Sequence, residues 1–142
     1  MSLNTLEEIA EYIVSDGKGI LAADESNPTC GKRFDSIGVE STETNRRDYR
    51  EMLFRAAGMQ DNIGGVILFD ETIRQSAEDG TPLVELIKTQ GALPGIKVDK
   101  GLAPLDSSPE ESVTQGLDGL DERCKEYFSL GAKFTKWRAV IK

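Results

Sequence analysis

Apolar residues recur along this chain with two spacings, which together predict helices and strands in alternation. A spacing of three and four residues predicts a first helix over residues 5–14, with Asn4 as its N-cap. The same spacing predicts a helix within residues 109–131. Terminal signals predict two more: an imperfect capping box at residues 41–44 opens a helix over residues 41–57, and Pro82 and Gly91 bound one over residues 82–90. The segments between these helices are therefore the places where strands are expected.

Four of those segments have the character of strands. Residues 19–23 and 64–69 are continuous apolar runs, as in strands that are covered on both faces. Residues 95–99 and 134–141 predict a third and a fourth strand. Strands that alternate with helices form a parallel sheet, so the sequence predicts an α/β fold.

The third and fourth predicted strands carry charged residues at alternate positions. Lys97 and Asp99 share one face of the third strand, and Lys136 and Arg138 share one face of the fourth. Charge within a sheet costs several kcal/mol unless it is paired or serves a site. Two interpretations are therefore open: edge strands with one solvated face, or the charged interior of a sugar-phosphate site.

Polar clusters follow the first three predicted strands at their carboxyl ends. They are Asp24–Ser26, Asp70–Glu71 and Asp99–Lys100. In α/β folds, ligands bind at the carboxyl ends of parallel strands. We therefore expect the functional site at this edge of the sheet.

The length of 142 residues corresponds to one domain, and two architectures fit the alternating pattern. One is a doubly wound open sheet. The other is the first half of a (β/α)₈ barrel, which takes about 250 residues in full. The half barrel is favoured, because a complete domain seldom stops on a charged strand without a covering helix.

Composition excludes several classes of function. The net charge of −8 and pI of about 4.6 argue against nucleic acid and acidic membrane surfaces as partners, because both need basic patches. The chain has no apolar run of membrane-span length and no basic amino-terminal leader, so the cytoplasm is expected. Histidine is absent, which excludes Ser-His-Asp and Cys-His mechanisms within the chain. No metal site is expected, and Cys30 and Cys124 are predicted to be reduced.

A set of short motifs extends over nearly the whole chain. They occupy residues 17–26, 31–33, 36–38, 45–47, 64–69, 95–101, 115–120 and 136–138. In their order and spacing they resemble the class I fructose-bisphosphate aldolase family. The resemblance implies that residues 1–142 are the amino-terminal part of a TIM (β/α)₈ barrel domain, with about four parallel strands and intervening helices.

The resemblance also implies an activity. Class I aldolases reversibly cleave fructose 1,6-bisphosphate to dihydroxyacetone phosphate and glyceraldehyde 3-phosphate, in glycolysis and gluconeogenesis. A lysine forms a Schiff base with the ketone and serves as the electron sink, so no metal or other cofactor is implied. The implied partners are these sugar phosphates and, in the full-length protein, further copies of the chain in a homotetramer.

Roles carry over to single positions of this sequence. Asp24 matches an aspartate beside the Schiff-base lysine, and Lys136 matches a lysine that stabilises charge and aids proton transfer. Both are implied to be catalytic. The implied substrate-binding residues are Ser26, Arg33, Arg46, Lys97 and Arg138. Several cations suit a substrate with two dianionic phosphates.

The family pattern is incomplete in this sequence. The Schiff-base lysine and the paired glutamates of the family lie downstream of the position of Lys142. We therefore expect the 142 residues alone to be inactive. An alternative function is a non-catalytic half barrel that binds sugar phosphates or another partner. Thr29 stands where many members have serine, which keeps a hydroxyl for a phosphate contact.

Overall fold

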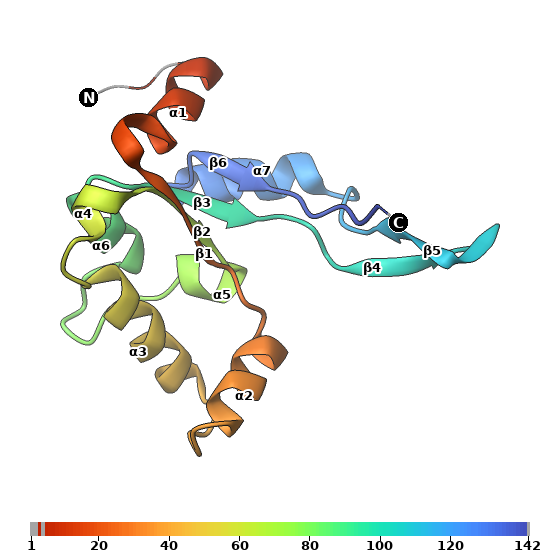
Figure 1. Ribbon diagram of the computed structural model, residues 1–142, viewed down its shortest axis with the longest axis horizontal. Helices are drawn as coiled ribbons and strands as arrows, with labels where there is room; N and C mark the ends of the chain where they lie inside the picture. The colour runs from red at the N-terminus through yellow and green to blue at the C-terminus, as the bar shows by residue number, and fades with distance from the viewer. Residues whose placement is uncertain (1–2, 4, 142) are drawn as a thin grey trace.

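The computed structural model describes residue 3 and residues 5–141, and its centre is a parallel sheet of four strands (Figure 1). The strands are β1 (Gly19–Ala23), β2 (Ile63–Leu68), β3 (Leu93–Lys97) and β6 (Phe134–Lys136). They lie side by side in the order β1-β2-β3-β6, which is also their order along the chain. The predicted α/β fold with four parallel strands is confirmed.

The register of the sheet brings the carboxyl ends of the strands together. Ala23 pairs with Leu68, Leu68 with Ile96, and Ile96 with Thr135. The residue that follows this row on each strand therefore lies at the same edge of the sheet. Asp24, Lys97 and Lys136 are three of those residues, so charges far apart in the sequence lie close together.

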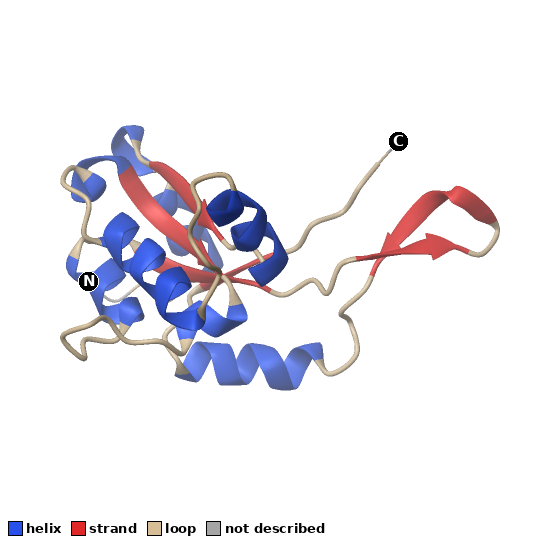
Figure 2. Ribbon diagram, turned by 90° about the horizontal axis from the view of Figure 1, so that it is seen from below, coloured by secondary structure: helices blue, strands red, loops and turns tan. Residues whose placement is uncertain are grey.

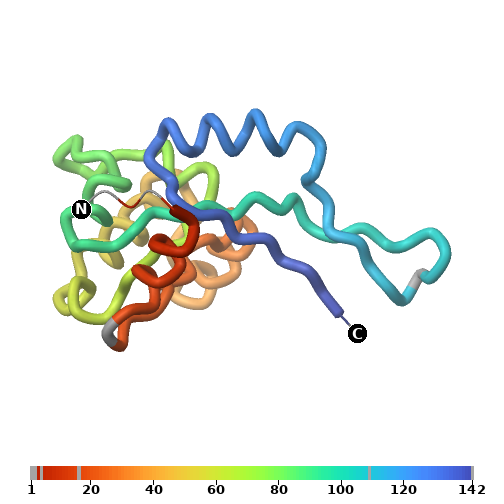
Figure 3. Tube along the Cα trace, turned by 90° about the horizontal axis from the view of Figure 1, so that it is seen from above, coloured from red at the N-terminus to blue at the C-terminus, as the bar shows by residue number. Residues whose placement is uncertain are grey.

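Helices connect the strands and cover the sheet. They are α1 (Leu6–Ile13), α2 (Asn27–Asp35), α3 (Glu43–Phe54), α4 (Met59–Asn62), α5 (Asp70–Ile73), α6 (Leu83–Thr89) and α7 (Leu120–Ser129), with a 3₁₀ turn, η1 (Ser15–Gly17). Figure 3 shows α1 and α7 on opposite sides of the strands. Leu68, Leu83 and Ile87 are fully buried in the core beneath the outer helices. Each such side chain stabilises the fold by about 1.5–3 kcal/mol.

Helix α1 begins where its sequence provides a cap. Thr5 is the N-cap: its hydroxyl accepts a hydrogen bond from the backbone N–H of Glu8, and the Glu8 carboxylate accepts one from Thr5. This reciprocal pair is a capping box, which satisfies two amide groups at the helix start. Asn4, the predicted cap, lies outside the described residues.

The helix predicted over residues 109–131 is wrong in its first half. Strands β4 (Leu102–Leu105) and β5 (Ser108–Thr114) form an antiparallel hairpin that projects beyond the sheet (Figure 2), and α7 begins only at Leu120. The apolar residues of helical spacing lie at positions 117–128. The polar segment before them therefore has no apolar face that packing could use to stabilise a helix. Pairing of Lys100 and Gly101 with Gln115 through backbone hydrogen bonds closes the base of the hairpin.

Two glycines leave room for an aromatic ring on the inner face of the sheet. A Cβ atom at Gly95 would collide with the ring of Phe134, and one at Gly65 would lie 3.1 Å from it. The ring of Phe134 therefore extends over β3 to β2, in the space that the two glycines leave. Farther along β6, on the same face, Lys136 reaches the cavity described below.

Gly64 makes a still closer approach, between β2 and the end of α1. A Cβ atom there would lie 2.7 Å from the carbonyl carbon of Ile13, which is backbone and cannot rotate away. We predict that Gly64→Ala lowers the free energy of unfolding by about 1–3 kcal/mol, as expected for overpacking. Urea denaturation followed by circular dichroism measures this change.

The matched control is Gly19→Ala on β1, where no atom lies within 4 Å of the added Cβ. The two variants have the same added methyl group in the same sheet. Equal urea midpoints for Gly64→Ala and Gly19→Ala would contradict the close approach of α1 to β2.

Candidate functional site

A cavity of about 850 Å³ lies at the carboxyl ends of the strands, where the sequence predicts a site. Six of the seven predicted site residues line it: Asp24, Ser26, Arg33, Lys97, Lys136 and Arg138. They come from the segment after β1, from α2, from β3, and from β6 and the segment after it. The register of the parallel sheet is the reason that these distant residues share one cavity.

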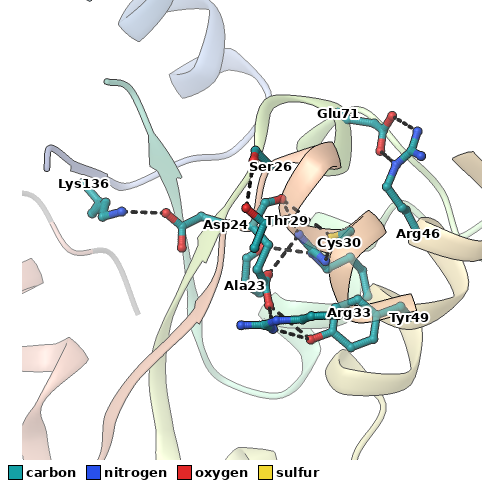
Figure 4. Close-up of polar contacts among 12 residues, drawn as sticks. Ala23, Asp24, Ser26, Thr29, Cys30, Arg33, Arg46, Tyr49, Glu71 and Lys136 are labelled. Carbon is teal, nitrogen blue, oxygen red and sulfur yellow. Dashed lines mark hydrogen bonds and ion pairs between the residues drawn. The ribbon is translucent and has the colours of Figure 1, made fainter. Parts of the chain in front are cut away.

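The first and last strands of the sheet meet through an ion pair. Lys136 Nζ lies 2.8 Å from a carboxylate oxygen of Asp24 (Figure 4). The lysine side chain is 31% exposed and the aspartate side chain 12% exposed, so the pair faces the cavity without being fully in solvent. The two residues implied to be catalytic are thus in direct contact.

Lys97 is held by the segment that follows its own strand. Its Nζ lies 2.9 Å from the carboxylate of Asp99 and donates a hydrogen bond of 2.7 Å to the Asp99 carbonyl. Burial acts to raise the pKa of Asp99, but the contact with Lys97 and backbone hydrogen bonds from Arg138 and Gly101 together outweigh it, so the pKa lies below its ordinary value. Because β3 lies between β2 and β6, the interpretation of residues 95–99 as an edge strand is wrong.

Arg138 contributes both backbone and side chain to this part of the site. Its backbone N–H donates to the Asp99 carboxylate at 3.3 Å, and its side chain lines the cavity. Among the described residues, no carboxylate forms an ion pair with the Arg138 guanidinium. This cation is therefore available to an anionic ligand.

Two hydroxyl groups stand at the amino terminus of α2, on the cavity wall. The Oγ atom of Ser26 and the Oγ1 atom of Thr29 are 3.1 Å apart, and both residues line the cavity. Ser26 is the N-cap of the helix, but its hydroxyl makes no capping hydrogen bond. The helix dipole and these hydroxyls favour an anion at this position.

Arg33 lies one turn farther along α2 and pairs with Glu25. Its guanidinium forms an ion pair with the Glu25 carboxylate and donates to the Tyr49 hydroxyl at 3.3 Å. The Glu25 carboxylate raises the pKa of Arg33, so the guanidinium stays charged. Its side chain is 57% exposed, so the head group is accessible from the cavity.

Arg46 is the one predicted site residue that does not line this cavity. It points toward Glu71, to which its Nε and one terminal nitrogen donate parallel hydrogen bonds, each of 2.8 Å (Figure 4). It also donates to the Ser41 carbonyl at 2.6 Å. The structure thus places Arg46 as a bidentate partner of a carboxylate between α3 and α5.

A further wall of the cavity could not be assigned from the sequence. Asp70 accepts a hydrogen bond from the Tyr127 hydroxyl at 2.9 Å, and Arg74 forms ion pairs with Asp70 and Glu126. Burial raises the pKa of Tyr127, and the bond to Asp70 raises it further. In the sequence, the one indication of this wall was the position of Asp70 after a strand. Arg74 and Glu126 are 52 residues apart, and Asp70 and Tyr127 are 57 residues apart, so no local pattern connects these partners.

The charge of the cavity differs from that of the whole chain. Seven cationic and five anionic side chains line it, although the chain carries a net charge of −8. Each of the five carboxylates has a cationic partner, so the excess charge is positive. Such a cavity suits a ligand with several negative charges.

Within the part of the chain that the structure describes, no three His, Cys, Asp or Glu side chains are grouped to hold a metal ion. The helices in that part are too short or too polar to cross a membrane. The described cysteines are free, with Cys30 buried and Cys124 half-buried.

Comparison with known proteins points to the same family that the sequence motifs resemble. The family model described as "Fructose-bisphosphate aldolase class-I" matches residues 5–142. A "Probable fructose-bisphosphate aldolase class 1" of Xanthomonas axonopodis pv. citri is 55% identical over 141 residues, which is 99% of this chain and 42% of the relative. "Fructose-bisphosphate aldolase 6, cytosolic" of Arabidopsis thaliana is 57% identical over 133 residues, 94% of this chain and 37% of the relative.

The fold has a close counterpart among solved structures. A fructose-bisphosphate aldolase of Plasmodium falciparum, solved in complex with TRAP and a small-molecule inhibitor, superposes with a TM-score of 0.89 at 54% identity. The match covers 92% of this chain and 38% of that chain. The predicted half of an aldolase TIM barrel is confirmed, and the chain spans about two fifths of the length of its relatives.

The pair of Arg46 and Glu71 leads to a pH-dependent prediction. The hydrogen bonds from Arg46 hold the pKa of Glu71 below its ordinary value of about 4.3. A depressed folded-state pKa means that the pair stabilises the fold above the unfolded pKa, and that this contribution is lost as the pH falls through the folded pKa. We predict that Arg46→Met raises the Glu71 titration midpoint, measured by NMR.

Arg47→Met is the control, because Arg47 pairs with the adjacent Asp48 and not with Glu71. It should leave the Glu71 midpoint unchanged. A Glu71 midpoint that is the same in all three proteins would show that Arg46 does not set the ionisation of this carboxyl group.

Proposed function

This chain belongs to the class I fructose-bisphosphate aldolase family, and from that membership we propose the activity of the complete protein. It cleaves fructose 1,6-bisphosphate reversibly to dihydroxyacetone phosphate and glyceraldehyde 3-phosphate. Residues 1–142 supply the first four strands of the barrel and one part of the active site. The chain spans 42% of a curated relative, so the remainder of the site belongs to sequence beyond these residues.

The contact between Asp24 and Lys136 carries this proposal. A carboxylate and an ammonium group 2.8 Å apart, in a cavity at the carboxyl ends of the strands, can accept and return a proton during imine chemistry. We assign Asp24 the orientation of the Schiff-base lysine and assistance in carbon–carbon cleavage. We assign Lys136 the stabilisation of charge during formation of the imine.

The remaining cavity residues are proposed to hold the substrate. Lys97, Arg138 and Arg33 provide positive charge for the two phosphates, and Arg33 and Arg138 can each bind a phosphate in bidentate fashion. Ser26 is proposed to donate its hydroxyl to a phosphate at the start of α2. The Arg46 substrate contact stays a prediction, since its guanidinium is engaged by Glu71 and Ser41.

The family resemblance supports further proposals for the complete protein. We propose that it works in glycolysis and gluconeogenesis in the cytoplasm, as its likeness to a cytosolic plant enzyme supports. We also propose one barrel domain and assembly as a homotetramer. Leu102 and Val113, exposed by 45% and 44% on the β4–β5 hairpin, support burial of apolar surface in such an assembly.

We predict separate effects on turnover and on affinity when the site is altered. The test protein is a full-length chimera in which residues 1–142 replace the matching segment of the Xanthomonas aldolase. Asp24→Ala should lower kcat about 100-fold or more with little change in KM, because Asp24 acts on a group that develops in the transition state. Lys97→Ala and Arg33→Ala should raise KM about tenfold, because these cations hold phosphate in the ground state as well.

Steady-state kinetics with fructose 1,6-bisphosphate measures both effects. Lys125→Ala is the control, because that lysine is 73% exposed and its ion-pair partner among the described residues is Asp121, also on α7. An inactive unsubstituted chimera would contradict the proposed activity. An Asp24→Ala chimera with near-normal kcat would remove Asp24 from the chemistry.

A second prediction concerns the 142 residues by themselves. Lys97 and Lys136 are both engaged in ion pairs, with Asp99 and Asp24, and neither matches the Schiff-base lysine of the family. We predict background aldolase activity and no covalent adduct after borohydride trapping with dihydroxyacetone phosphate. A stoichiometric adduct on either lysine, located by mass spectrometry, would contradict the assignment.

The alternative of a non-catalytic binding module can be tested in the same preparation. The observation that favours it is that these residues alone form a cavity with an excess of cations. Calorimetric binding of fructose 1,6-bisphosphate by the 142 residues, together with an inactive chimera, would support that alternative over the enzyme.

A further inference from the structure

Arg50 is a charged residue in the core of this protein, and it stands outside the set of predicted site residues. Its side chain is 2% exposed, and it lies on α3 one turn before the fully buried Phe54. A buried guanidinium is tolerated when its donors are satisfied and a carboxylate balances its charge. The contacts of Arg50 therefore show what this charge is used for.

The guanidinium of Arg50 donates hydrogen bonds to the backbone on both sides of Asp24. Its Nε donates to the Ala23 carbonyl at 2.9 Å, and one terminal nitrogen donates to the Glu25 carbonyl at 2.9 Å. Asp24 is the single residue between these two carbonyls. The planar guanidinium fixes the spacing between its donors, so it also fixes the direction in which the Asp24 side chain leaves the chain.

The remaining contacts of Arg50 hold the same segment to α2. The terminal nitrogen near Glu25 also lies 3.0 Å from the Glu25 carboxylate. The other terminal nitrogen lies 3.3 Å from the buried thiol of Cys30. The ring of Tyr49 lies beneath the guanidinium, 5.1 Å from ring centre to the central carbon of Arg50. Arg50 is thus fixed from several directions and is itself a rigid anchor.

We propose that Arg50 is a positioning residue for the reaction, which acts by clamping the chain on either side of Asp24 and so directing its carboxylate toward Lys136. Among the described residues, the hydrogen-bond partner of the Asp24 carboxylate is Lys136, whose Nζ lies 2.8 Å from Asp24 Oδ2. The inference rests on the proposed function for its kinetic consequence. The clamp itself is a property of the fold and can be measured separately.

Hydrogen–deuterium exchange of the full-length chimera tests the clamp. Arg50→Lys keeps the charge, but one ammonium nitrogen cannot reach both carbonyls and the carboxylate at once. Amides of the peptide that contains residues 23–26 should exchange about tenfold faster, as follows from the loss of one hydrogen bond of ordinary strength. Arg47→Lys is the matched control, on the same helix and paired with its neighbour Asp48.

Kinetics of the same proteins tests the consequence for Asp24. Arg50→Lys should lower kcat about tenfold or more, with KM for fructose 1,6-bisphosphate changed less than about twofold, because a misplaced catalytic group affects the transition state most. An unchanged kcat would overturn the proposal. A fall in kcat that is no larger than the fall in the fraction of folded protein would overturn it too. Faster exchange at residues 23–26 in Arg47→Lys would overturn it as well.

The two hypotheses fail in different ways. An inactive unsubstituted chimera contradicts the proposed function, while slow exchange at residues 23–26 that depends on Arg50 still supports the clamp. If Arg50→Lys does not fold, NMR of the unsubstituted protein tests the clamp instead. The Nε–H proton of Arg50 must then exchange with water far more slowly than that of Arg47, and equal exchange rates would overturn the clamp.

Discussion

The contact between Asp24 and Lys136 depends on the curvature of the sheet. Asp24 directly follows β1 and Lys136 ends β6, at opposite edges of the four-stranded sheet, yet their charged groups lie 2.8 Å apart. Three strand spacings amount to about 14 Å in a flat sheet, which is farther than one aspartate and one lysine side chain can span. The sheet must therefore be concave on the side of these residues. This concavity turns a row of strand ends into a cavity.

Charge within the cavity is balanced locally and left positive overall. Lys97 lies against Asp99, Lys136 against Asp24 and Arg33 against Glu25. Each pair offsets part of the desolvation that burial imposes on both partners. Arg138 has no carboxylate partner among the described residues, and the hydroxyl of Ser26 makes no capping bond. Most charges of the cavity are therefore paired within the protein, while Arg138 and the Ser26 hydroxyl keep groups that an anion can bind.

Much of the fold was visible in the sequence, because local patterns determine it. Residues 19–23 were predicted as a strand and are one, and residues 82–90 contain α6. The hairpin was missed because β5 has polar residues at most positions, so no period identified it. Helix α2 was not predicted, because a loop was expected to begin at the polar cluster Asp24–Ser26; Pro28 is favourable in the first turn of this helix. Six residues that line the cavity were predicted from the family resemblance, whereas Arg50 was found only from its three-dimensional contacts. The sequence around Arg50 shows only that this charged residue lies on the same helical face as Phe54.

The order of the strands also bears on how the chain folds. Within the parallel sheet, each strand pairs with the member of that sheet that precedes it along the chain, with the β4–β5 hairpin inserted between β3 and β6, so the sheet can be extended one strand at a time from its amino-terminal end. Contacts with large sequence separation carry the greatest loop-closure cost and tend to form late. The pair of Asp24 and Lys136 joins residues 112 positions apart and requires β6 to be in place. This ion pair, and the wall of the cavity that it joins, are therefore absent from every partly folded state in which that strand is not yet added.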